Sequence, residues 1–422
     1  MTVVVGIRGV VPMVAEDVQR PARWSQRAGA LARWVERHDY RAYDPGDGQR
    51  SWLSALTLGQ PWAERLLTAG VLRAPVNLRP ILGIQPHTST KGMGYMAWGY
   101  LLRYQFRRDP RDAAKARTCL QWLIDHRSDT SVGMAWGNDF TFTTRAGRIP
   151  KGEPTIVWSA LIGQAFLAGH AVLAEERYLD VAKEVCRWMS TLPVQATSRG
   201  SCLSYVPSRQ VSIHNANMLG AALLAQVGAL SGCEAWMHLA RTAMHYSVDR
   251  QREDGSWTYA QGSKYQWIDN FHTGYNLDSL HRYLQAMPSQ EADASGQRAL
   301  ERGLAYYLDR FFLPEGQPRY EARRTWPMDI QCAAQSIDTL TLLRSVSPQA
   351  YAMACRVADW TLDHMQDRDG HFYYRKHRGW TNKTPMFHWG QATMFKALSH
   401  LSWATLSEGA SAVGKLPVRA IQ

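Results

Sequence analysis

The chain has 422 residues, of which 45% are apolar and 20% charged, so it is long enough for a sizeable core and too apolar for intrinsic disorder. Its formal charge of +12 favours acidic partners, but the basic residues are scattered and no nucleic-acid motif is present, which argues against nucleic acid. Six separated cysteines, no signal peptide and no apolar run of 18 residues predict a cytoplasmic protein with reduced thiols and no transmembrane segment.

The first predicted helix covers residues 23–37, after a loose lead-in at 15–21. Apolar side chains recur on one face of this segment, including Trp24, Leu31 and Val35. A turn-rich loop follows at 44–48. Residues 51–85 then hold a shorter apolar helix between connections interrupted by prolines.

A repeat of about 58 residues occupies the rest of the chain. Apolar helices are predicted to begin near Lys91, Thr155, His214, Asn270, Asp329 and Phe387. A more charged amphipathic helix follows each of the first five, at 111–126, 176–191, 234–250, 296–312 and 349–366. A segment rich in glycine and aromatic residues comes after each charged helix. The repeating unit is therefore an inner helix, an outer helix and an aromatic turn.

Six inner helices with five following outer helices leave one outer position open, and the helix at 23–37 can fill it. The pattern predicts an all-α protein, an (α/α)6 toroid of six helical hairpins closed by the N-terminal helix. We expect one domain over residues 1–422, with loose termini at 1–20 and 408–422.

The inner-helix N-termini should share one mouth, where free backbone N–H groups favour polar ligands. The richest stretch is 267–276, and its Phe271-His272-x-Gly274 returns two periods later as Phe387-His388-x-Gly390. The catalytic candidates are His272, His388, Asp269, Tyr275 and Asp329. The substrate-binding candidates are Trp136, Asn138, Asp139, His214, Asn215, Trp257, Tyr259, Glu321, Arg323, Arg324, Tyr373 and Gln391.

Two sugar chemistries and one non-catalytic role fit these candidates. A pair of imidazoles assisted by Tyr275 suits acid/base work at a sugar carbon, as in epimerases and lyases. A carboxylate pair drawn from Asp139, Asp269, Asp329 and Glu321 suits a glycoside hydrolase, although an Asp before a helix is more often its N-cap. The third reading is a glycan- or partner-binding toroid in which the aromatic rings matter most. No motif for a nucleotide cofactor or a metal occurs, so we expect neither.

Four stretches resemble VpsJ-type bacterial polysaccharide-biosynthesis proteins: 75–83, 136–140, 254–257 and 267–275. The similarity covers about residues 50–400 and rests most on Ile-Asp-Asn-Phe-His-Thr-Gly at 268–274. It implies an (α/α)6 toroid that acts in exopolysaccharide, capsule or lipopolysaccharide synthesis. The implied substrate is an oligo- or polysaccharide, acidic in some cases, or an activated sugar, and other glycan-assembly proteins are implied partners. More distantly the chain resembles the N-acylglucosamine 2-epimerase clan, whose two inner-helix histidines would correspond to His272 and His388.

Overall fold

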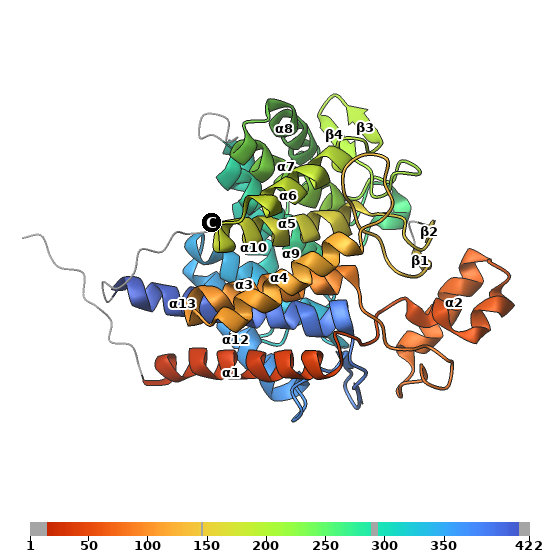
Figure 1. Ribbon diagram of the computed structural model, residues 1–422, viewed down its shortest axis with the longest axis vertical. Helices are drawn as coiled ribbons and strands as arrows, with labels where there is room; N and C mark the ends of the chain where they lie inside the picture. The colour runs from red at the N-terminus through yellow and green to blue at the C-terminus, as the bar shows by residue number, and fades with distance from the viewer. Residues whose placement is uncertain (1–14, 145–146, 288–293, 413–422) are drawn as a thin grey trace, which may run out of the picture.

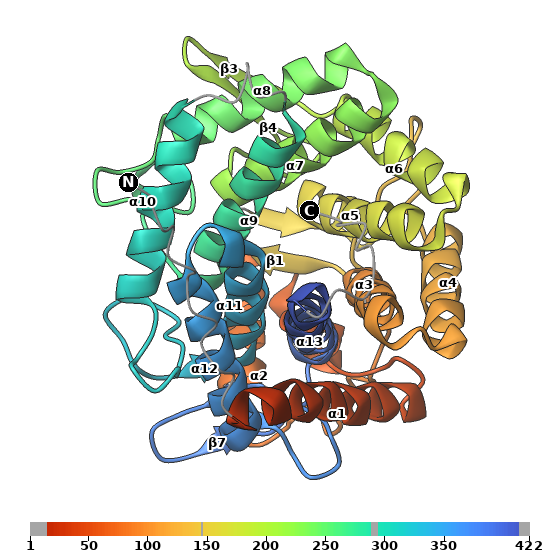
Figure 2. The ribbon, with the colours of Figure 1, turned by 90° about the vertical axis from the view of Figure 1, so that its left-hand side faces the viewer.

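The computed structural model describes residues 15–144, 147–287 and 294–412. Figure 2 looks along the ring, with one set of helices around the centre and a second set outside it. The inner helices are α3 (Thr90–Arg107), α5 (Ile156–Leu173), α7 (His214–Ser231), α9 (Asn270–Ala286), α11 (Ile330–Leu342) and α13 (Ala392–Ala412). The outer helices are α4 (Pro110–Asp125), α6 (Glu176–Met189), α8 (Glu234–Val248), α10 (Ala294–Arg310), α12 (Pro348–Met365) and α1 (Ala15–Arg37). The predicted (α/α)6 toroid is confirmed.

Each predicted inner helix begins close to its expected residue because the sequence supplies a cap or an apolar run there. Ser89, Thr155, Asp269 and Asp329 precede four of the inner helices, and each side chain accepts a hydrogen bond from a backbone N–H of the first turn. The last inner helix enters through one π-helical turn, Phe387–Gln391. Capping fixes where each helix starts, and therefore which side chains lie at the mouth.

Helix α5 is apolar enough to correct one expectation from the sequence. Its 18 residues, Ile156–Leu173, reach the length and hydropathy of a membrane span, although no apolar run of that length is expected from the sequence. In the structure 78% of this helix is buried. A helix that is apolar on all sides is also what the inner layer of a toroid requires, because neighbours cover every face.

Helix α1 closes the ring between the last and first hairpins, as predicted (Figure 2). On one side, Trp24 Nε1 donates to Asp359 of α12 at 2.8 Å. On the other side, Glu36 accepts hydrogen bonds from Tyr100 of α3 at 2.7 Å and Lys115 of α4 at 2.6 Å. The predicted loose segments at 1–20 and 408–422 lie largely outside the described residues. Where they are described, at 15–20 and 408–412, the backbone is helical, so the loose lead-in at 15–21 is wrong.

A glycine lies at each of five junctions between neighbouring hairpins. Gly133, Gly200, Gly255, Gly316 and Gly370 follow successive outer helices and all have positive φ, from +67° to +109°. A Cβ on any of them would lie less than 3.0 Å from a carbonyl oxygen of the next outer helix. The aromatic turns therefore pack directly on the neighbouring backbone, and only glycine allows that approach.

Short strands and one projecting lobe surround the mouth (Figure 1). The strands are β1 (Phe142–Thr144), β2 (Gly147–Ile149), β3 (Val194–Thr197), β4 (Gly200–Leu203), β5 (Met328–Asp329), β6 (Arg375–Lys376) and β7 (Thr381–Asn382). They pair antiparallel in the orders β1-β2, β3-β4 and β5-β6-β7. The lobe contains the 3₁₀ turn Trp52–Thr57 and helix α2 (Pro61–Arg73). We define the apolar lobe as residues 51–85.

Candidate functional site

His388 lies at the mouth beside a carboxylate from the loop after α1. Its Nδ1 is 2.7 Å from Asp44 Oδ2 and 3.2 Å from Ser89 Oγ. The backbone N–H of His388 donates to the other Asp44 oxygen at 2.9 Å. The carboxylate favours a proton on Nδ1, which leaves Nε2 as the basic nitrogen. Burial lowers the pKa of His388 against the opposing effect of Asp44, so the ring is neutral at neutral pH.

His272 repeats this arrangement at the fourth inner helix. Asp269 caps α9 through the backbone N–H of His272 at 2.9 Å, and its second oxygen lies 2.6 Å from His272 Nδ1. The His272 side chain is 21% exposed, whereas Asp269 is buried. The Asp269 carboxylate therefore does two things: it caps α9, and it orients the His272 imidazole.

Aromatic rings connect the two Asp–His pairs. Phe271, next to His272, meets Trp389, next to His388, edge to face with ring centroids 5.1 Å apart. Tyr259 stacks on Trp267 at 4.3 Å and approaches the His272 ring at 4.8 Å. The predicted register of the two histidines thus corresponds to two similar pairs on either side of one aromatic contact.

Lys91 and Tyr275 lie in a buried polar network on the axis of the ring. Lys91 Nζ is 3.3 Å from the Tyr275 hydroxyl, which also contacts Tyr95 at 3.0 Å and Gln331 at 3.1 Å. Burial lowers the pKa of Lys91 to about 8 and raises that of Tyr275. Tyr275 is therefore a neutral hydrogen-bonding group, and Lys91 is the cation beside it.

Several polar atoms at the mouth are buried without a hydrogen-bond partner in the described part of the chain. They include Asp44 Oδ2, whose 2.7 Å approach to His388 Nδ1 is an ion-pair contact, both ring nitrogens of His87, both carboxylate oxygens of Glu153, Trp158 Nε1, Asn215 Oδ1 and Gln331 Oε1. His87 Nε2 lies 3.7 Å from both Asp44 and Asp139. Burial without a partner costs each such atom about 1–3 kcal/mol, so this concentration favours a site that binds water or a polar ligand.

Three predicted sugar-binding residues instead serve the packing of the ring. Trp136 and Trp257 are 0% and 2% exposed, and their indole N–H groups donate at 2.8 Å to backbone carbonyls of Leu123 and Ser247. Gln391 is fully buried and bonds the backbone N–H and carbonyl of Phe372. Their burial and internal hydrogen bonds argue against the predicted role of these three side chains in sugar binding.

Asp329 is also committed to the structure. Its carboxylate caps α11, accepts from Trp389 Nε1 at 2.8 Å and pairs with Arg375 at 2.5 Å. The group is 0% exposed. Both oxygens of Asp329 are engaged inside the protein, which argues against its predicted role in acid/base catalysis.

The remaining candidates divide between the mouth and the periphery. Asp139 is half-exposed, and its carboxylate lies 3.4 Å from Arg50 and 3.7 Å from His87. The side-chain oxygen of Asn138 accepts a hydrogen bond from the backbone N–H of Asp139. Asn215 is buried with an unpartnered amide oxygen. Four more were predicted around the same mouth: Glu321, Arg323, Arg324 and Tyr373. The backbone of Glu321 pairs with that of Asp269, and its side chain forms an ion pair with the exposed Arg324. Arg323 is also exposed. The Tyr373 hydroxyl donates a hydrogen bond to Asp367 on the turn after α12.

Both ring nitrogens of His214 are bonded within the protein. Nδ1 lies 3.2 Å from Ser247 Oγ and Nε2 lies 2.9 Å from the Gln261 amide. Burial, reinforced by Arg250, lowers its pKa to about 4. With both nitrogens bonded inside the protein, His214 has no ring nitrogen free for a substrate, which argues against its predicted role in binding.

Acid is expected to destabilise the protein through two buried histidines. His214 and His281 protonate at about 4 when folded, mainly because of burial, against an ordinary value of 6.5. Between these values the unfolded chain binds more protons, so stability falls as pH drops from 6.5 to 4, by up to about 1.4 kcal/mol per pH unit for each. Urea denaturation across this range measures the slope. A His214→Gln variant should show a shallower slope, and an unchanged one would contradict the assignment.

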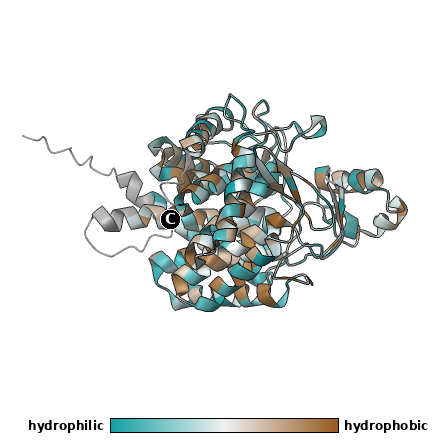
Figure 3. Ribbon diagram, turned by 90° about the horizontal axis from the view of Figure 1, so that it is seen from above, coloured by the Kyte–Doolittle hydropathy of each residue, from teal (hydrophilic) through white to brown (hydrophobic). Residues whose placement is uncertain are grey.

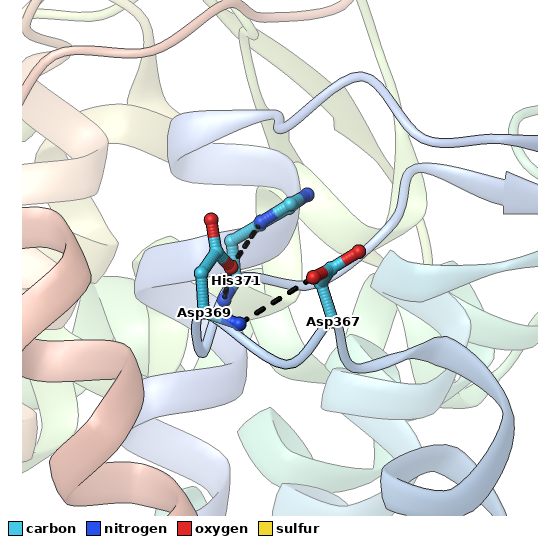
Figure 4. A group of neighbouring side chains, drawn as sticks. All are labelled: Asp367, Asp369 and His371. Carbon is cyan, nitrogen blue, oxygen red and sulfur yellow. Dashed lines mark hydrogen bonds and ion pairs between the residues drawn. The ribbon is translucent and has the colours of Figure 1, made fainter.

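One group of side chains on the turn after the outer helix α12 has metal-ligand spacing (Figure 4). Candidate ligand atoms of Asp367, Asp369 and His371 lie within 4.8 Å of one another on the turn after α12. They bond locally instead: Asp369 accepts from His371 Nδ1 at 2.6 Å and from Trp34 of α1 at 3.0 Å. This group fastens the turn to α1, and the absence of a metal stays a prediction.

Asp44 is the main site residue that the sequence analysis did not select. Its neighbours Pro45 and Gly46 mark a turn, and that signal predicts a loop without indicating a site. The turn follows α1, which was placed in the ring, so its position at the mouth could have been inferred. Its pairing with His388, 344 residues away, could not.

No family model matches this sequence, and no curated protein does. Solved structures share its fold. Cellobiose 2-epimerase from Bacillus thermoamylovorans B4167 has a TM-score of 0.59 and 10% identity, with 76% of this chain and 90% of that chain covered. An unsaturated glucuronyl hydrolase specific for heparin has a TM-score of 0.60 and 12% identity, with 93% and 98% covered. A polysaccharide lyase has a TM-score of 0.54 and 11% identity, with 78% and 92% covered. The chain therefore has the (α/α)6 toroid fold of these enzymes.

Proposed function

We propose that this protein is a carbohydrate-active enzyme that performs acid/base chemistry at a sugar carbon, as an epimerase or a lyase. The observation that carries the proposal is the pair of Asp-oriented imidazoles, Asp44–His388 and Asp269–His272, at the N-termini of two inner helices. In each pair the carboxylate at Nδ1 prepares Nε2 to accept a proton. The names of the structural neighbours, which include an epimerase and a lyase, support the same class.

The chemistry assigns different tasks to the residues around the pairs. One imidazole removes a proton from a carbon next to a carbonyl, and the C–H electron pair moves into the carbonyl as an enolate forms. The second, protonated imidazole returns a proton to the other face, which inverts the carbon; in a lyase the enolate instead expels the β-oxygen. Lys91 supplies positive charge near the enolate oxygen, and Tyr275 holds Lys91 in place.

We further propose the setting that the VpsJ-type resemblance implies. The substrate is then an oligo- or polysaccharide, acidic in some cases, or an activated sugar, in cytoplasmic steps of surface-polysaccharide synthesis, alongside other glycan-assembly proteins. The net charge of +12 supports an acidic substrate.

Incubation with a panel of reducing and uronate-containing oligosaccharides in D₂O, followed by NMR, tests the reaction. We expect deuterium at one sugar carbon together with either an inverted centre or an unsaturated uronate that absorbs in the ultraviolet. A new reducing end without deuterium would instead favour a glycoside hydrolase. Asp139 supports this second candidate, because it is an exposed acid at the mouth that lies 3.7 Å from the buried His87 ring.

Binding of a glycan without any turnover would favour the non-catalytic toroid. That reading depended mainly on aromatic platforms, and burial of Trp136 and Trp257 weakens it.

A further inference from the structure

The apolar lobe carries an unusual concentration of exposed hydrophobic side chains. Twelve large hydrophobic residues are exposed in the described part of the chain, and seven of them lie within this lobe. The seven are Trp52, Leu56, Leu58, Trp62, Leu66, Val76 and Ile81, each between 60% and 83% exposed. Figure 3 shows brown, hydrophobic segments on the projecting lobe. A patch of this kind on a protein surface marks a binding surface.

Leu58 shows that the exposed hydrophobic side chains of the lobe are not confined to helix α2. It is the most exposed of the seven, at 83%, and lies at the end of the 3₁₀ turn with φ +50°. Glycine or asparagine is the usual residue at such a backbone angle. Here a leucine occupies the position, and its side chain is directed to solvent.

The charge of the lobe selects its partner. Its one acidic residue, Glu64, is buried and bonds Arg148 of β2 at 3.1 Å. The exposed polar side chains are Gln60, Arg65, Arg73 and Gln85. The lobe therefore presents aliphatic tips, two tryptophans and two arginines to solvent, without an exposed carboxylate. Tryptophan and arginine beside inserted aliphatic groups suit the interface of an anionic bilayer.

We propose that the apolar lobe docks on an anionic lipid bilayer. A second copy of the chain is the other occupant to consider, but protein interfaces carry about one hydrogen bond per 100–200 Å². Four exposed polar side chains on a surface of this size supply few donors or acceptors, whereas a bilayer requires none from the inserted tips.

Docking would also bring the mouth to the membrane surface. Arg79 of the lobe bonds Asp47 at 2.8 Å, and Asp47 accepts from the backbone N–H of Asp44, the residue beside His388. Arg79 and Asp47 are both buried, so the lobe is joined to the site by a rigid polar connection. Membrane docking does not require His388 to be catalytic, so the two proposals can fail separately.

Sedimentation with lipid vesicles tests the proposal. The wild-type protein should bind vesicles that contain phosphatidylglycerol, bind phosphatidylcholine vesicles less, and lose affinity as salt is added. Leu56→Asp with Leu58→Asp should lower binding at least about tenfold, because two apolar tips leave the bilayer. Arg65→Glu with Arg73→Glu should remove the preference for anionic lipid.

Leu230→Asp is the matched control, because Leu230 is 60% exposed near the C-terminal end of α7, at the end of the ring away from the mouth. It should bind vesicles as the wild type does. Circular dichroism and thermal unfolding check that every variant is folded. Absence of vesicle binding by the wild type, or equal loss in the control, would overturn the proposal. A wild-type dimer in sedimentation velocity that Leu58→Asp dissociates, without vesicle binding, would assign the lobe to a second copy.

Discussion

Replacing His388 by Gln is expected to slow proton transfer at the sugar carbon by about 10²–10⁴-fold, the usual contribution of a general acid or base. The buried ring is neutral at neutral pH and has its Nδ1 held by Asp44, so its Nε2 can accept a proton. Glutamine keeps a polar side chain but cannot accept that proton. Deuterium incorporation by NMR, on whichever sugar the panel identifies, gives the rate. His272→Gln should cause a loss of the same order.

The pH profile separates catalysis from a structural effect. Because burial lowers the pKa of His388, the acidic limb of kcat/KM should lie below the ordinary imidazole value of about 6.5. The Asp44 carboxylate opposes that shift, so Asp44→Asn should move the limb to still lower pH as well as reduce the rate. A structural role for Asp44 would change stability and leave the limb in place.

His371→Gln is the control for both histidines, because His371 also pairs with an aspartate but lies on the outer turn after α12 (Figure 4). It should retain the wild-type rate. If the wild type turns the sugar over and either His388→Gln or His272→Gln does so at full rate, the assigned acid/base pair is wrong.

Gly255→Ala is expected to lower the free energy of unfolding by about 2–5 kcal/mol. Its φ of +87° costs an L-residue about 1–2 kcal/mol, and the new methyl would meet the Arg302 carbonyl of α10 at less than 3.0 Å, which adds an overpacking cost of about 1–3 kcal/mol. Backbone cannot rotate away as a flexible side chain can. The same hairpin junction recurs at Gly316 and Gly370, so these positions should behave alike. Urea denaturation followed by circular dichroism measures the change.

The chain offers a control at the C-terminal end of α7. Gly232 has φ +67° in the left-handed region, yet a Cβ there would meet nothing within 4 Å. Gly232→Ala should therefore cost only the backbone strain, about 1–2 kcal/mol. The difference between the two variants isolates the contact between neighbouring hairpins. Equal losses at the two positions would show that this contact does not limit stability.

The ring could be predicted from the sequence because its order is local and repeated. Each inner helix is marked by an apolar run after a capping residue, as at Thr155 and Asp269, and the interval between starts hardly varies. Closure by α1 followed from the one unfilled outer position. The register of His272 and His388 followed from the same interval.

Roles within the site were harder to predict, because the type of an aromatic or acidic residue does not tell whether its side chain faces the protein interior or the mouth. The sequence favours Trp257 as a sugar platform, but its indole N–H donates to the Ser247 carbonyl at the end of the preceding outer helix. The sequence favours Asp329 as a catalytic acid, but Arg375 and Trp389 occupy its oxygens. The partners of Asp329 are 46 and 60 residues away, so no local pattern predicts them.

Closure of the ring by α1 has a consequence for how the protein is made. Trp24 bonds Asp359, 335 residues later in the chain. At about 5–20 residues per second, a ribosome needs roughly 20–70 s to make the intervening segment. Throughout that time the face of α1 that carries Trp24 and Trp34 has no partner on α12 or its turn. Closing the ring therefore has to wait until α12 has been synthesised, and until then this face of α1 lacks its partner.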